Sequence, residues 1–145
     1  KEFRRLLHLT AIPVEGAEEL LEYLYKKDYC LCAASNGPYE QQINRLKSAD
    51  MLKYFDYCFV SEKIGADKPG KQFFDGCMRL LPGVQPEECM MIGDSLTADI
   101  TGGRAYGMST CWYVPSVEKY REEKSKSGKP ADHIIHDLLE LKKIL

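Results

Sequence analysis

Residues 89–99 read CMMIGDSLTAD, an apolar run followed by two aspartates five positions apart. Such a run, bounded by polar residues and followed by a helical pattern over residues 96–106, is typical of a strand buried on both faces of a parallel sheet. Ligands of open parallel sheets bind at the carboxyl ends of the strands. Asp94 and Asp99 are therefore candidate site residues.

The rest of the chain alternates in the same way. The expected strands are residues 29–35, 57–61, 89–93 and 109–114, with a short edge strand at 133–135. The expected helices lie around residues 17–24, 38–46, 73–81, 96–106 and 137–145, and residues 116–129 form a polar helix or loop. Short apolar strands alternating with amphipathic helices predict an α/β, Rossmann-like fold of three layers, with helices on both faces of a parallel sheet.

Composition narrows the class of protein. The 145 residues carry 20 Lys and Arg against 22 Asp and Glu, and 44% are hydrophobic, which fits one globular domain. Without a basic excess we expect no nucleic-acid partner, and without a long apolar run we expect no membrane span. Six cysteines, most of them in apolar runs, predict reduced core thiols and a cytoplasmic protein. The chain does not begin with Met, which suggests a fragment or a processed chain.

Three short segments carry candidate chemistry. Ser35 ends a strand before Asn36, and backbone amides at the following helix start can hold a phosphate oxygen, although the same residues are ordinary turn formers. Lys68 lies in the loop GADKPG and can stabilise transferring charge, although a solvated loop lysine is the ordinary alternative. Asp94 and Asp99 suit Mg²⁺, although Asp94 can also cap a helix and Asp99 can be a surface residue.

The order and context of these segments resemble the haloacid dehalogenase-like (HAD) hydrolase superfamily, and its helical-cap (subfamily I) phosphatases in particular. The matching segments are LCAASNG around Ser35, IGADKPG around Lys68 and MMIGDSLTAD around Asp94, within residues 13–115. The resemblance implies Mg²⁺-dependent hydrolysis of a small phosphorylated metabolite through an aspartyl-phosphate. Ser35 and the amide of Asn36 would bind the phosphoryl oxygens. Lys68 would bridge the nucleophile and the phosphoryl group.

In the same resemblance Asp94 would ligate Mg²⁺, and Asp99 would support the metal through water or orient Lys68. The family's first motif, DxDxT, is absent, and no DxD occurs anywhere in the chain. That motif lies on the family's central strand, so we expect this strand and most of the cap to be missing. Residues 1–12 resemble the last helix of the cap, which makes them a cap remnant and residues 13–145 the core domain.

A missing central strand leaves a gap between the strands that end at Ser35 and Gly93. A separate N-terminal segment, a partner chain or direct pairing of the two flanking strands is expected to close it, because unpaired strand edges invite aggregation. Without its nucleophile the chain by itself is expected to be inactive, since phosphate monoesters need very large rate accelerations.

Three alternatives stay open. A catalytically inactive HAD-like domain used for binding or regulation is favoured if no DxDxT segment exists. A GDSL-type esterase would use Ser95 as its nucleophile, but Asp132-His133 does not have the spacing of that family's second block. A metal-independent dehalogenase would lack the carboxylate that Asp94 provides.

Overall fold

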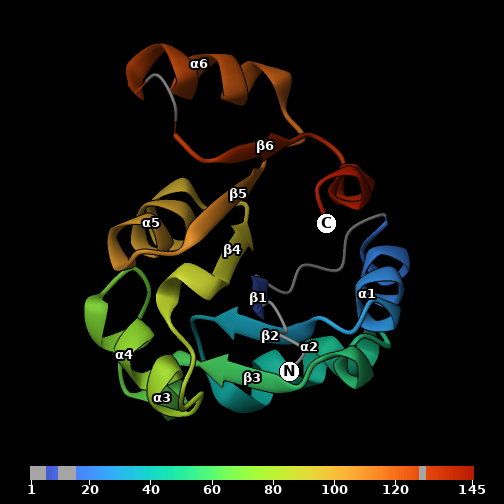
Figure 1. The fold of residues 1–145 in the computed structure, drawn as a ribbon, viewed down its shortest axis with the longest axis vertical. Helices are drawn as coiled ribbons and strands as arrows, with labels where there is room; N and C mark the ends of the chain where they lie inside the picture. The colour runs from blue at the N-terminus through green and yellow to red at the C-terminus, as the bar shows by residue number, and fades with distance from the viewer. Residues whose placement is uncertain (1–5, 10–15, 128–129) are drawn as a thin grey trace.

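The computed structural model describes residues 6–9, 16–127 and 130–145. Its centre is a six-stranded sheet in the order β3-β2-β1-β4-β5-β6, in which all neighbouring strands run parallel (Figure 1). The strands are β1 (Leu6–Leu9), β2 (Cys30–Ser35), β3 (Tyr57–Val60), β4 (Cys89–Gly93), β5 (Ser109–Tyr113) and β6 (His133–Ile135). The predicted parallel α/β fold is confirmed.

Helices cover both faces of this sheet. The α-helices are α1 (Ala17–Lys26), α2 (Tyr39–Ser48), α3 (Ser61–Ile64), α4 (Lys71–Arg79), α5 (Gly102–Tyr106) and α6 (Val117–Ser127). Helical turns of other types are η1 (Leu52–Tyr54), η2 (Pro86–Glu88), η3 (Leu96–Thr101) and η4 (Leu138–Lys143). Side chains of α1, α2 and η4 pack on one face of the sheet, and those of α4, α3 and α5 pack on the other.

The apolar runs of β2 and β4 are continuous because both faces of these two strands are buried. On β2, Leu31 and Ala33 face the core under α1, whereas Cys32 and Ala34 face the core under α4. On β4, Met90 and Ile92 face the core under α1, whereas Cys89 and Met91 face the core under α4. This alternation follows from the two-residue period of a strand. Because β2 and β4 both run parallel to β1, their carboxyl ends lie at the same edge of the sheet.

Strand β1 fills the position where the sequence predicted a gap. Leu6–Leu9 pairs with β2 on one side and with β4 on the other, so that Leu6 lies level with Cys30 and Cys89. Residues 1–12 were expected to be the last helix of a cap; Leu6–Leu9 form a strand instead, and the assignment of residues 1–12 to a cap remnant stays a prediction. The remaining residues of that range, 1–5 and 10–12, lie outside the described residues.

Backbone hydrogen bonding explains why Leu6–Leu9 occupies the position between β2 and β4. Two parallel strands held apart by one strand width present unpaired N–H and C=O groups to each other, and a short apolar segment such as LLHL satisfies both rows. The chain itself therefore supplies the central strand in this structure. The assignment of residues 13–145 to a core domain stays a prediction.

Several local features differ from the sequence expectation. The stretch 96–106 begins with the π-helix η3 before α5, and the last helix is the 3₁₀ segment η4. The turn α3 was not predicted. All six cysteines are free thiols, and four of them are fully buried. Across the described part of the chain, none of the helices combines the length and apolarity that spanning a bilayer requires.

Candidate active site

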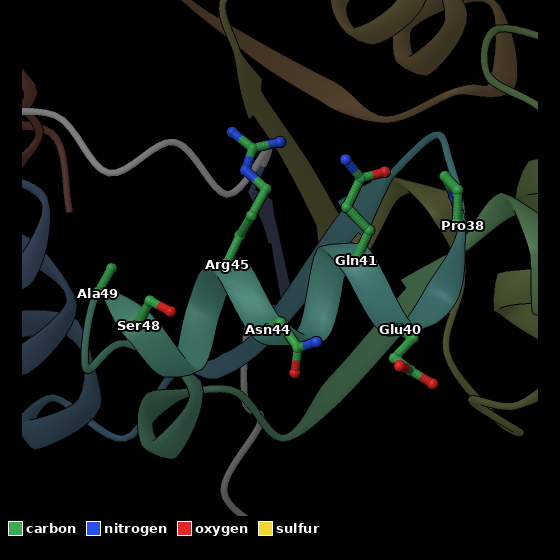
Figure 2. Close-up of a pocket in the computed structure, with 7 residues that line it drawn as sticks. All are labelled: Pro38, Glu40, Gln41, Asn44, Arg45, Ser48 and Ala49. Atoms are coloured by element: carbon green, nitrogen blue, oxygen red, sulfur yellow. The ribbon is translucent and has the colours of Figure 1, made fainter.

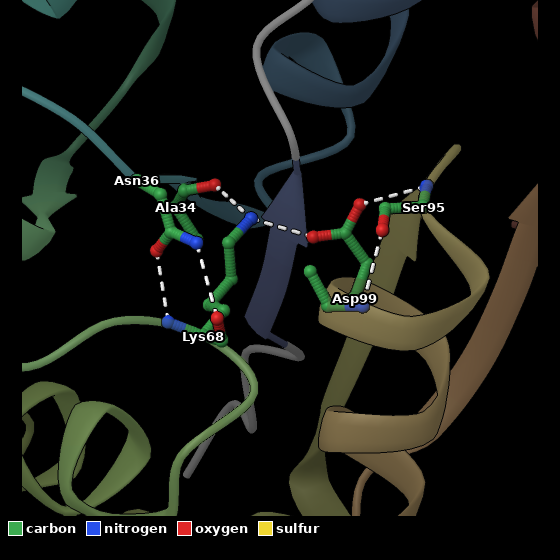
Figure 3. A network of polar contacts seen from close by, with 6 residues as sticks. Ala34, Asn36, Lys68, Ser95 and Asp99 are labelled. Carbon is green, nitrogen blue, oxygen red and sulfur yellow. Dashed lines mark hydrogen bonds and ion pairs between the residues drawn. The ribbon is translucent and has the colours of Figure 1, made fainter.

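Lys68 and Asp99 form a buried ion pair at the carboxyl edge of the sheet. The Lys68 ammonium lies 2.5 Å from Asp99 Oδ1, and these side chains are only 4% and 1% exposed. The same ammonium donates to the backbone carbonyl of Ala34 at 2.8 Å (Figure 3). Because Ala34 belongs to β2 and Asp99 follows β4, Lys68 connects the ends of the two strands that flank β1.

The second oxygen of Asp99 is also engaged. Asp99 Oδ2 accepts a hydrogen bond from the backbone N–H of Ser95 at 3.2 Å. A Cβ on residue 93 would lie 2.6 Å from Asp99 Cγ, so only glycine at the end of β4 leaves room for this carboxylate. Asp99 sits in the π-helix η3, a helix type that often marks functional sites. Its carboxylate therefore faces Lys68 and Ser95.

Asp94 follows β4 directly and is exposed. Its backbone carbonyl accepts a hydrogen bond from Nε1 of the buried Trp112 at 3.1 Å, which anchors the main chain at this point. The Asp94 carboxylate itself forms no hydrogen bond or ion pair with any described residue. Asp94 thus presents a free oxygen ligand at the edge where the strands end.

The donor set can be compared with the needs of Mg²⁺. Among residues 6–9, 16–127 and 130–145, no three His, Cys, Asp or Glu side chains gather into a metal-binding group. Mg²⁺ is usually held by one or two carboxylates and completes its shell with water and substrate phosphate oxygens. Asp94 fits that role with its free carboxylate. Asp99 fits it less well, since both of its oxygens already have partners.

Ser35 ends β2 with its side chain almost fully covered. The residue is 8% exposed, and its hydroxyl makes no hydrogen bond to any residue that the structure describes. A buried hydroxyl without a partner costs about 1–3 kcal/mol, so such groups generally have a ligand or a function. Ser35 is therefore suited to binding an oxygen atom of a ligand at this edge.

The amides at the start of α2 are less available than the sequence suggested. Gly37 donates its N–H to Ser61 Oγ at 2.8 Å, and Tyr39 donates its N–H to Glu62 Oε1 at 2.6 Å. Pro38 has no N–H to offer. Of the amides predicted to bind phosphate, that of Asn36 remains the candidate. The Asn36 side chain itself bonds to the backbone of Lys68 (Figure 3).

Two hollows lie near the start of α2. One of about 540 Å³ separates the beginning of α2 from the loop before Lys68, and it is lined by Gly37, Pro38, Ser61, Glu62, Gly65, Ala66 and Asp67. The other, of about 910 Å³, runs along the outer side of α2 (Figure 2) and is lined by Pro38, Glu40, Gln41, Asn44, Arg45, Ser48 and Ala49. The first hollow is bordered by the segment that follows Ser35 and by the loop that precedes Lys68.

Ser95 is the N-cap residue of η3. Its hydroxyl accepts the N–H of Ala98 at 3.0 Å and so caps η3, as serine commonly does at a helix start. Ser61, Glu62 and Trp112 have supporting roles that were not predicted from the sequence. Ser61 could have been found because it is the last residue of the predicted strand 57–61 at the same sheet edge, whereas no sequence pattern marks Trp112.

Comparison with known proteins decides the family. Residues 1–113 match the family model described as haloacid dehalogenase-like hydrolase. The chain belongs to this family. This match outweighs the esterase alternative for the Gly93-Asp94-Ser95 segment.

Relatives of this haloacid dehalogenase-like chain carry several names. Pyrimidine 5'-nucleotidase PynA of Streptococcus pneumoniae (strain ATCC BAA-255 / R6) is 41% identical over 102 residues, 70% of this chain and 43% of PynA. Glyceraldehyde 3-phosphate phosphatase of Pyrococcus furiosus (strain ATCC 43587 / DSM 3638 / JCM 8422 / Vc1) is 30% identical over 141 residues, 97% of this chain and 57% of that enzyme. The chain spans about half the length of the curated relatives it matches.

A solved structure supports the same assignment. The HAD-hydrolase YfnB from Bacillus subtilis, bound to magnesium, superimposes with a TM-score of 0.80 at 34% identity. The superposition covers 91% of this chain and 55% of YfnB. The haloacid dehalogenase-like core is therefore shared in both sequence and three-dimensional structure.

Proposed function

We propose that this chain is the larger part of a Mg²⁺-dependent phosphate-monoester hydrolase that works through an aspartyl-phosphate. The observation that carries the proposal is the buried Lys68–Asp99 pair at the edge where the strands end, together with the Ser35 hydroxyl at the end of β2, which has no hydrogen-bond partner among the described residues. A fixed positive charge and a free donor suit the dianionic phosphoryl group. Family membership supports this reaction over other uses of the fold.

Each side chain has a role in this proposal. Ser35 and the amide of Asn36 donate to the phosphoryl oxygens, and Lys68 stabilises the charge that develops between nucleophile and phosphoryl group. Asp99 orients Lys68, since both of its oxygens are engaged away from a metal position. Asp94 holds Mg²⁺, which when bound would neutralise phosphate charge as a Lewis acid.

The nucleophile is not among these residues. Strand β1 reads LLHL and contributes no carboxylate between β2 and β4, and the chain contains no DxD. We place the nucleophilic aspartate on a separate N-terminal segment or on a second chain, which in the complete protein takes the position of β1 between β2 and β4. The shared length with the relatives, about half of each, supports a longer complete protein.

The substrate we propose is a small phosphorylated metabolite. The relatives named above act on a pyrimidine nucleotide in one case and on glyceraldehyde 3-phosphate in the other, so the shared feature is the phosphate monoester. We further place the protein in the cytoplasm, because its six free thiols belong in a reducing compartment.

The test is Mg²⁺-dependent hydrolysis of p-nitrophenyl phosphate by the complete protein. Asp94→Asn is expected to lower kcat by at least about 10³-fold, because it removes the proposed metal ligand. Asp50→Asn is the matched control: it makes the same change at an exposed position after α2 and should leave kcat unchanged. Full turnover by Asp94→Asn would refute the metal assignment.

A binding or regulatory domain is the second candidate function. The observation that favours it is β1 itself, because the strand at the centre of the sheet carries no carboxylate. If the protein is a binding or regulatory domain, the chain is expected to bind inorganic phosphate and never to form an aspartyl-phosphate with any added segment. Trapping with a phosphoryl-transfer analogue such as beryllium fluoride, followed by ¹⁹F NMR, separates the two functions.

A further inference from the structure

Hydrogen bonds join the loop after β2 to the segment after β3, and each segment contributes one side chain that bonds to the backbone of the other. In the loop after β2, Asn36 Oδ1 accepts the backbone N–H of Lys68 at 2.8 Å. Asn36 Nδ2 donates to the backbone carbonyl of Lys68 at 3.1 Å (Figure 3). One side chain thus satisfies both polar backbone atoms of Lys68, whose own side chain reaches Ala34 and Asp99.

Ser61 makes the reciprocal arrangement from the opposite segment. Its hydroxyl oxygen accepts the backbone N–H of Gly37 at 2.8 Å and donates its proton to the backbone carbonyl of Gly37 at 3.4 Å. Ser61 is 6% exposed, so water competes weakly for these bonds. Next to it, the Glu62 carboxylate accepts the N–H of Tyr39 and holds the first turn of α2.

Ser35 and Lys68, which are proposed to bind the phosphate, lie next to or within these hydrogen-bonded segments. Ser35 is one residue before Asn36, and the Lys68 side chain begins at the backbone that Asn36 holds. Together with the bond from the Lys68 ammonium to the Ala34 carbonyl, the two pairs therefore help to fix the separation between the Ser35 hydroxyl and the Lys68 ammonium. Precise separation matters because misplacement by about 1 Å costs catalytic sites on the order of 10²-fold in rate.

We propose that Asn36, through its side chain, and Ser61 are positioning residues that hold the Ser35 and Lys68 loops as one unit. The proposal rests on the phosphatase function proposed above, yet its structural half, the coupling of the two loops, can be measured independently. Neither side chain needs to touch the phosphate for this role.

The experiment measures backbone amide exchange and inorganic phosphate binding on the full chain by NMR. Asn36→Ala removes the acceptor of the Lys68 N–H. If the loops are one unit, exchange also accelerates at the Gly37 N–H, whose acceptor Ser61 is unchanged. Ser61→Ala should produce the converse pair of effects. Each amide is expected to exchange at least about fivefold faster, the factor carried by one net hydrogen bond.

Phosphate titration gives the functional half of the result. Asn36→Ala and Ser61→Ala should each weaken inorganic phosphate binding by at least about fivefold, and Ser61→Thr, which keeps a hydroxyl, should restore most of it. Matched controls are Asn44→Ala and Ser48→Ala, the same changes on the exposed side of α2 (Figure 2), which should alter neither measurement.

The outcomes separate the two proposals. Faster exchange at only the amide that loses its own acceptor, in both variants, would overturn the coupling of the loops. If the unaltered chain binds no phosphate while the cross-effect on exchange is present, the phosphatase proposal fails and the coupled unit stands. Unchanged phosphate affinity in both variants, with binding by the unaltered chain intact, would overturn the positioning role.

Discussion

Lys68 and Asp99 form an ion pair that solvent hardly reaches, and this governs what substitution does to either residue. Asp99→Asn leaves the Lys68 ammonium buried without its counter-charge, which is expected to lower the free energy of unfolding by about 3–5 kcal/mol. Lys68→Met combined with Asp99→Asn removes both charges and should recover most of this loss. Urea denaturation followed by circular dichroism measures all three proteins.

The control for this residue-scale prediction is an exposed pair. Glu22 and Lys26 lie 3.5 Å apart on α1, with side chains 53% and 72% exposed. Glu22→Gln should change the free energy of unfolding by less than about 0.5 kcal/mol, because exposed pairs of this kind contribute little. An Asp99→Asn protein as stable as the unaltered chain would show that Lys68 does not depend on this carboxylate.

Helices α4 and α5 are linked by a bond between Tyr106 and Asp75 on the face opposite α1. Tyr106 Oη donates to Asp75 Oδ1 at 2.6 Å, and its ring stacks on Phe74 at 5.3 Å between ring centroids. Burial, aided by the hydrogen bond to Asp75, raises the pKa of Tyr106 to about 12. Tyr106→Phe keeps the stacking, loses the bond and should lower the free energy of unfolding by about 1 kcal/mol.

This element-scale contribution has a pH window. Because the pKa of Tyr106 is higher in the folded chain than the unfolded value of about 10, folding favours the neutral phenol. The stabilisation is complete below pH 10 and is lost as the pH rises toward 12. Tyr106→Phe should therefore flatten the stability curve in that range, whereas Tyr25→Phe, at an exposed ring, should not. An unchanged curve in Tyr106→Phe would contradict the prediction.

The whole molecule depends on β1, because four residues at the centre of the sheet join its two halves. Leu7→Pro removes a backbone donor from the ladder and is not tolerated in a central strand. We expect a loss of about 3 kcal/mol or more, or failure to fold, in urea denaturation. The same substitution at Val117, the first residue of α6, should be tolerated because proline suits that helix position.

A Leu7→Pro chain that unfolds like the unaltered protein would mean that Leu6–Leu9 does not hold the sheet together in solution. The position between β2 and β4 would then be available to another strand, as the missing DxDxT segment requires. The experiment therefore bears on the completing segment proposed above as well as on the fold.

Much of this fold follows from local pattern. The four longer predicted strands and the helix under Leu20 and Leu24 were predictable, because strands buried on both faces and amphipathic helices leave period and length in the sequence. The rule that ligands bind at the carboxyl ends of parallel strands then pointed to Ser35, Lys68 and Asp94. The roles given to these residues stay predictions, since they concern a ligand.

Other features depend on contacts between distant segments. The π-helix η3 and the turn α3 are short, and local propensity does not distinguish them from ordinary helix or loop. The engagement of Gly37 and Tyr39 could not be anticipated, because their acceptors, Ser61 and Glu62, lie more than twenty residues away. Sequence reasoning therefore overestimated the amides available at the start of α2.

The sequence by itself determined the parallel sheet, its helical layers and the family, because apolar period and short ordered motifs are local properties of the chain. Tertiary structure decided that Leu6–Leu9 enters the sheet as a strand. A segment of four residues forms a strand here because the backbones of β2 and β4 pair with it on both sides. It also decided that Asp99 faces Lys68, because ion pairs between segments depend on where the backbone brings them, and no local pattern encodes that distance.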